Sequence, residues 1–133
     1  MKTSIIAYLA TGLSFLAIDG VWLTLMTSRL YKPLLRDLLA DTVQPIPAVL
    51  FYALYIAGIV IFVILPSISA GRWFDATWRG AAFGLIAYAT YDLTNQATMR
   101  GWPTIITAAD LCWGMFITAV AGTLGFLAAK TWG

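Results

Sequence analysis

The sequence contains no histidine and only one cysteine, and these two shortages exclude several kinds of site. Without imidazole, the chain cannot build bis-histidine haem ligation, a histidine-based di-iron centre or a zinc site that uses histidine. Cys112 has no second cysteine with which to form a disulfide within the chain, so the redox compartment cannot be inferred. We therefore expect neither a metal site nor a bound cofactor.

Charged residues are also scarce. They make up 11% of the 133 residues, whereas a soluble domain carries about 25%. Hydrophobic residues make up 61% of the chain, and the mean hydropathy is +0.85. This composition is typical of an integral membrane protein, so the expected partner is the lipid bilayer. The net charge of +2 is too small to indicate nucleic acid, and the length favours one domain over residues 1–133.

Four apolar stretches are long enough to cross a bilayer. Because the backbone has almost no hydrogen-bond partners in lipid, each stretch is expected to be a helix. The first stretch exceeds the apolar region of a signal peptide, so we interpret it as a retained span. We predict an all-α polytopic membrane protein, a bundle of four transmembrane helices. The predicted spans cover residues 4–27, 46–65, 76–98 and 104–129.

Proline, glycine and aspartate mark the expected ends of these helices. Pro45 precedes the second helix and Pro66 is expected to end it. Asp75 is well placed to cap the third helix. Gly101 fits a helix stop and Pro103 fits the first turn of the fourth helix. So short a connection predicts an antiparallel hairpin of the third and fourth helices.

The segment from Arg29 to Asp41, between the first two spans, has a different pattern. Leucines recur at roughly helical spacing among charged residues, which predicts a short amphipathic helix lying at the membrane interface. The alternative is a loop packed against the end of the bundle. The leucines are Leu30, Leu34, Leu35, Leu38 and Leu39, and the charged residues include Lys32, Arg36 and Asp37.

The basic residues give little information on orientation in the membrane. Four lie on the side of the two termini and four on the opposite side, so the positive-inside rule shows no bias. The free amino terminus favours termini in the cytoplasm, and the same balance suits a dual-topology protein. The terminal side carries Lys2, Arg72, Arg79 and Lys130, and the opposite side carries Arg29, Lys32, Arg36 and Arg100.

Small residues recur at four-residue spacing on the third and fourth predicted helices. Gly80 and Gly84 lie on the third helix, and Gly114, Thr118 and Gly122 lie on the fourth. Such ridges let helices approach closely in lipid. We expect them to pack the bundle together, and a homodimer through the same surface is a second use.

Three aspartates fall within the predicted spans. Counting about 1.5 Å per residue from the membrane side opposite the termini, Asp19 lies about 12 Å deep, and Asp92 and Asp110 lie about 9 Å deep. A carboxylate in hydrocarbon costs several kcal/mol unless it is protonated, paired or facing water. We therefore expect the three to share one polar pocket. Burial and mutual repulsion favour the neutral form, so at least one should be protonated at neutral pH, with Arg29 and Arg100 the basic residues able to reach them.

Aromatic and amide side chains lie near each aspartate along its helix. Helical spacing of three and four residues places them beside the carboxylates, with the hydroxyls of Thr94 and Thr98 nearby. Tryptophan and tyrosine combine an apolar ring with one donor, so the set predicts the lining of a binding pocket. Interhelical hydrogen bonds that only hold the bundle together are the alternative. The candidate ligand-binding residues are Asp19, Trp22, Tyr88, Tyr91, Asp92, Asn95, Asp110 and Trp113.

Four short motifs resemble a known family. They are IDGVWL in the first helix, YDLTNQAT at the end of the third, the GWP turn, and DLCWG in the fourth. The chain is similar over nearly its whole length to a family of small bacterial four-span membrane proteins of unknown function. The resemblance implies a four-helix fold in the bacterial inner membrane and supports the candidate site residues. It implies no activity.

Three functions fit the predicted pocket. The first is binding, with or without modification, of a lipid-like or amphipathic small molecule, in which Asp92 or Asp110 would act as acid or base. The second is proton-coupled transport of a small molecule with Asp19 as the coupling group. The third is a structural accessory subunit whose carboxylates pair with a partner's basic residues. No motif identifies a substrate or establishes that the protein is an enzyme.

Overall fold

The computed structural model describes residues 1–35, 39 and 44–133, and within these the chain is helical and contains no strand. The first helical segment consists of α1 (Lys2–Met26), the π-helix η1 (Thr27–Tyr31) and α2 (Lys32–Leu35). The second consists of α3 (Pro45–Ile59), the π-helix η3 (Val60–Ile64) and α4 (Leu65–Ala70). Two longer helices follow, α5 (Trp73–Thr98) and α6 (Thr104–Trp132). The prediction of an all-α protein is confirmed.

Three helical segments are long and apolar enough to cross a membrane. They are Lys2–Leu35 with 34 residues, Pro45–Ala70 with 26, and Thr104–Trp132 with 29. The prediction of four spans is thus confirmed for three. The α5 helix has 26 residues, but Arg79, Asp92 and Asn95 among others make it too polar to qualify on composition.

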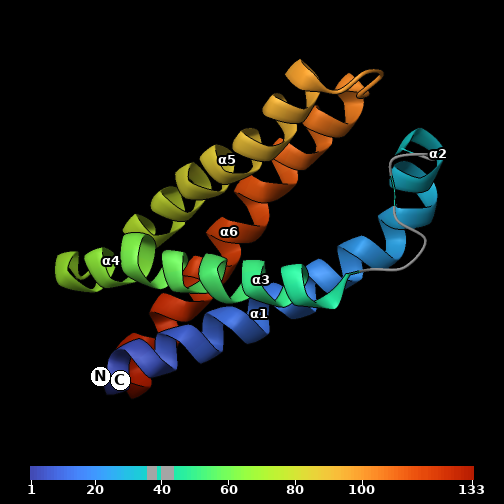
Figure 1. Cartoon of the computed structure of the whole chain (residues 1–133). Coiled ribbons are helices and arrows are strands. Elements are labelled where there is room, and N and C mark those ends of the chain that lie inside the picture. The colour runs from blue at the N-terminus through green and yellow to red at the C-terminus, as the bar shows by residue number, and fades with distance from the viewer. Residues whose placement is uncertain (36–38, 40–43) are drawn as a thin grey trace.

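The α5 and α6 helices form the predicted antiparallel hairpin (Figure 1). Gly101 in the turn has a φ of +76°, a left-handed conformation that glycine adopts without steric cost. The predicted small-residue ridge lies between the two helices. A Cβ added at Gly80 would stand 2.7 Å from the carbonyl oxygen of Thr118, and one at Gly84 would meet the backbone of Gly114. This surface is therefore buried within the chain.

The first helical segment is longer than predicted. It does not end near Thr27 but continues through the π-helix, where the N–H of Lys32 donates to the carbonyl of Thr27, five residues earlier. Leu35 at its end packs against Trp102 and Ile106 beside the α5–α6 turn. For residues 29–35, the prediction of a separate interfacial helix is therefore wrong, because this stretch continues α1 and packs on the α5–α6 hairpin. The rest of that predicted helix, including Arg36, Asp37, Leu38 and Asp41, lies outside the described residues or in the single described residue Leu39.

Pro66 does not end the second helical segment, which continues to Ala70. The preceding π-helix η3 widens the turn, with the N–H of Leu65 donating to Val60, and a wide turn accommodates a proline ring and its missing donor. The helix ends instead at Gly71, with a φ of +78°. Asp75 does not cap α5 either, because its carboxylate accepts from the Arg72 guanidinium at 3.2 Å.

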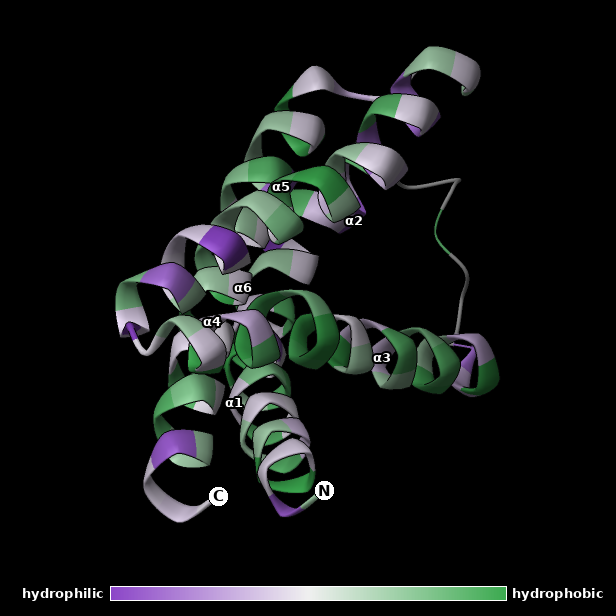
Figure 2. Cartoon of the chain, turned by 90° about the vertical axis from the view of Figure 1, so that its left-hand side faces the viewer, coloured by the Kyte–Doolittle hydropathy of each residue, from purple (hydrophilic) through white to green (hydrophobic). Residues whose placement is uncertain are grey.

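The α3–α4 segment crosses the α5–α6 hairpin obliquely in both overall views (Figures 1 and 2). The main core lies where α1, the end of α3, η3 and α6 meet. Its side chains that are at most 1% exposed include Phe15, Ile59, Val63, Ile117 and Phe126. Large apolar side chains also cover much of the outer surface, as expected where lipid replaces water. The two termini lie side by side (Figure 1).

Candidate functional site

The three predicted aspartates are all buried. Asp19 on α1 is 6% exposed, Asp92 on α5 is fully buried, and Asp110 on α6 is 9% exposed. Among the described residues, no ion pair joins any of them to a basic side chain. Arg29 and Arg100, expected to reach them, are exposed and form no such pair. The carboxyl groups therefore depend on neutral donors and on one another.

Asp19 accepts two hydrogen bonds from aromatic side chains. The Tyr52 hydroxyl on α3 donates to one carboxylate oxygen at 2.7 Å, and the Trp113 indole N–H on α6 donates to the other at 3.1 Å. The Tyr52 ring packs edge-on against Phe15, with centroids 6.0 Å apart. Asp19 thus ties three helices together through donors that carry no charge.

A tryptophan pair links this acid to the second one. Trp22 stacks on Trp113 with centroids 4.2 Å apart and planes 10° from parallel. The Trp22 indole N–H donates to the Tyr31 hydroxyl at 3.1 Å, and that hydroxyl donates to Asp110. Asp19 and Asp110 therefore belong to one connected group of side chains, which we call the carboxylate network.

Asp92 completes the carboxylate network and has no donor. Its carboxyl group lies close enough to that of Asp110 for the two to interact. Two ionised carboxylates have no hydrogen to donate, and both buried oxygens of Asp92 are without a donor from any other described residue. A single proton between the two groups would supply the missing donor. We call Asp92 and Asp110 the carboxyl pair.

The other predicted site residues lie around this group rather than in it. Tyr88 packs its ring against the backbone of Gly114 and 6.3 Å from the ring of Tyr55. The Tyr91 side chain is 61% exposed, and Asn95 is half-buried. The hydroxyls of Thr94 and Thr98 donate to carbonyls of their own helix rather than to the aspartates.

Two tyrosines of the carboxylate network were not among the predicted site residues. Tyr52 on α3 is one of them, and its hydroxyl donates to Asp19. Tyr55 packs in the core, and its hydroxyl pairs with Thr118 at 2.8 Å. A tyrosine inside an apolar helix needs a partner for its hydroxyl, and this was the available signal for Tyr52. Tyr31 gave no comparable signal, because it lies in the charged segment after α1.

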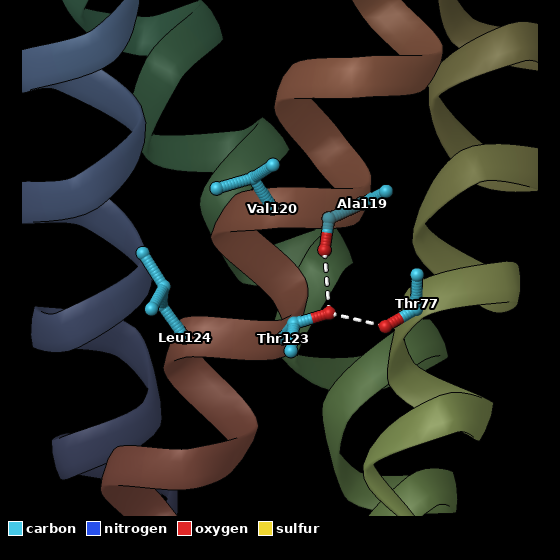
Figure 3. A pocket seen from close by; sticks show the side chains of 5 residues that line it. All are labelled: Thr77, Ala119, Val120, Thr123 and Leu124. Atoms are coloured by element: carbon cyan, nitrogen blue, oxygen red, sulfur yellow. Dashed lines mark hydrogen bonds between the residues drawn. The ribbon is translucent and has the colours of Figure 1, made fainter.

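Two hollows of the structure are lined by residues other than the three aspartates. One of about 200 Å³ is lined by Thr77 of α5 and by residues of α6 (Figure 3). The Thr123 hydroxyl there donates to the Ala119 carbonyl and pairs with Thr77, so its polar atoms already have partners. A second, open hollow of about 400 Å³ lies along α1 around Gly20 and Thr24. None of the three aspartates lines either hollow.

Comparison with known proteins agrees with this description of a membrane protein. No curated protein and no solved structure matches the chain. The family described as "Predicted membrane protein (DUF2177)" matches residues 4–127, a range that includes every member of the carboxylate network. The resemblance inferred from the four sequence motifs is thereby confirmed. The chain belongs to this family of membrane proteins of unknown function.

Proposed function

We propose that the carboxyl pair holds one proton within the membrane and that the protein couples movement of this proton to transport of a small solute. The observation that carries the proposal is the fully buried Asp92, whose two oxygens have no donor and which lies close to Asp110. Two adjacent negative charges in a low-dielectric interior are costly, and one shared proton removes their repulsion. A site of this kind takes up or releases a proton when the hydration or the charge around its two carboxyl groups changes enough.

The chemistry of the linking side chains divides the carboxylate network into two proton sites. Tyrosine hydroxyls both donate and accept, so Tyr31 extends the carboxyl pair and Tyr52 extends Asp19. An indole N–H only donates, so protons do not pass through Trp22 and Trp113. The stacked indoles link the two sites by contact alone, an arrangement suited to coupling protonation at one acid to a change of shape at the other.

The alternative functions receive less support. Binding of a lipid-like molecule at the acids requires room among them, and the acids line neither of the two hollows described above. A role as an accessory subunit requires carboxylates that a partner's basic residues reach, whereas these are buried behind aromatic side chains. We therefore rank both functions below proton-coupled transport. Asp19 keeps its predicted role as a coupling group but is joined by the carboxyl pair.

Infrared spectroscopy of the purified protein in lipid nanodiscs tests the proton site. We expect a carbonyl stretching band of a protonated carboxylic acid at neutral pH, lost in Asp92→Asn because that variant removes the fully buried acid of the pair. Asp75→Asn is the matched control, since Asp75 is equally buried but paired with Arg72. A wild-type spectrum without this band contradicts the proposal.

Proton flux into proteoliposomes, driven by a solute gradient, tests the coupling. We expect Asp92→Asn to abolish this flux.

We also propose that α5 is a fourth membrane span and that the termini are cytoplasmic, in a bacterial inner membrane. Support comes from the pairing of α5 with α6, a candidate span, over most of its length. Its exposed threonines add little polarity, because Thr90, Thr94 and Thr98 each donate their hydroxyl to the carbonyl four residues earlier.

Labelling of single cysteines tests this topology. In a Cys112→Ser background, Arg72→Cys and Arg100→Cys place one thiol at each end of α5, where both native side chains are exposed. A membrane-impermeant maleimide added to intact cells should label only the cysteine at position 100. Labelling of both positions would mean that α5 does not cross the membrane, and labelling of position 72 alone would reverse the orientation.

A further inference from the structure

Trp102, in the turn between α5 and α6, is buried although it lies at the end of a hairpin. Its side chain is only 8% exposed, and its indole N–H donates to the Thr107 hydroxyl at 3.1 Å. The ring meets Tyr91 edge-on at 6.0 Å. Leu35, at the end of the first helical segment, packs with it and with Ile106. In both overall views this segment and the turn lie at the same end of the molecule (Figures 1 and 2).

Three of the residues around Trp102 are linked to the carboxyl pair by sequence position or by a hydrogen bond. Tyr91 directly precedes Asp92, and Thr107 lies one helical turn before Asp110. Tyr31 packs against the same apolar cluster as Trp102 and donates its hydroxyl to Asp110. The indole therefore lies between the carboxyl pair and the membrane surface at the turn.

The opposite direction along the hairpin is closed. Beyond the carboxyl pair, α5 and α6 touch through their backbones, so that a Cβ at Gly84 would meet the carbonyl group of Gly114. The Tyr88 ring lies directly against Gly114. Such backbone contact leaves no space for water between α5 and α6 in this direction.

We infer that Trp102 is the gate that controls proton access to the carboxyl pair from the α5–α6 turn, and that Thr107 and Leu35 hold its ring in the closed position. The inference rests on the proposed proton site and specifies its route of exchange. Trp102 carries no proton to the pair, because an indole N–H only donates; it acts by excluding water.

Hydrogen–deuterium exchange of the protonated carboxyl band measures this access directly. After transfer of nanodiscs into D2O, we expect the band of the wild type to shift slowly and that of Trp102→Ala to shift at least tenfold faster. Thr107→Val keeps the ring but removes its hydrogen bond, and should give an intermediate rate. Trp132→Ala is the control, because that tryptophan is 66% exposed near the other end of α6 and should exchange like the wild type.

The outcomes separate this inference from the proposed function. A band that is present but exchanges at the wild-type rate in both Trp102→Ala and Thr107→Val overturns the gate and leaves the proton site intact. A wild-type protein without the band overturns the proton site and the gate together. Should Trp102→Ala fail to fold, Thr107→Val and Leu35→Ala still decide the matter, because faster exchange in them supports the gate and unchanged exchange contradicts it.

Discussion

Replacing Gly84 by valine is expected to prevent the α5–α6 hairpin from assembling. The added Cβ would meet the carbonyl of Gly114 and the Thr118 hydroxyl, which lies 2.7 Å from its ideal position. Overpacking a well-packed interior costs about 1–3 kcal/mol where side chains can shift. Here the obstacle is the backbone of a neighbouring helix, so the helices must separate and the loss should exceed that range.

Gly20→Val is the matched control for this prediction. Gly20 also lies within a helix, but a Cβ there has no neighbour within 4 Å. We expect the melting temperature of Gly20→Val in detergent micelles to stay close to that of the wild type, with Gly84→Val giving no monodisperse folded protein. Equal yield and melting temperature for the two variants would mean that the hairpin does not pack as closely as described.

The sequence was sufficient to bring the three acids to one level of the molecule. The arithmetic of helix rise placed Asp19, Asp92 and Asp110 at similar depth, and the cost of a carboxylate in lipid indicated that they face inward. The small residues Gly80 and Gly84 likewise predicted the close hairpin. These inferences succeed because they depend on regular helices and on strong energetic penalties.

The two π-helices explain much of what the sequence did not reveal. In η1 the turn contains an additional residue, and this rotates the following side chains relative to an ideal α-helix. Tyr31 therefore points toward Asp110, whereas α-helical spacing would place it on a different face of the helix. In η3 the same widening lets the helix continue past Pro66. Neither wide turn has a clear signature in the residues that form it.

The sequence also did not reveal which polar residues of α5 are buried. Spacing of three and four residues correctly groups Tyr88, Asp92 and Asn95, but it does not say where the buried face ends. Asp92 is fully buried, whereas its neighbour Tyr91 is 61% exposed. Hydroxyls such as that of Thr94 bind their own backbone, an option that makes them poor indicators of a polar pocket.

Leucine substitutions at Asp19 and at Asp92 are expected to have opposite effects on stability. Asp19→Leu leaves the Tyr52 hydroxyl and the Trp113 indole N–H without an acceptor. Each buried donor left unsatisfied costs about 1–3 kcal/mol. Asp19→Asn keeps one acceptor oxygen, so it should be more stable than Asp19→Leu by about that amount.

Apart from the proton shared within the carboxyl pair, Asp92 has no donor, so its replacement by leucine leaves no tyrosine or indole donor unsatisfied. A buried acceptor without a partner costs about 1–3 kcal/mol, and an apolar side chain at the same position removes that cost. We therefore expect Asp92→Leu to melt at or above the wild-type temperature while losing the protonated carboxyl band. Thermal unfolding of Asp19→Leu, Asp19→Asn, Asp92→Leu and Asp92→Asn in the same micelles measures the contrast. Strong destabilisation by Asp92→Leu would mean that Asp92 holds the helices together, and its burial would then no longer argue for a proton site maintained at the expense of stability.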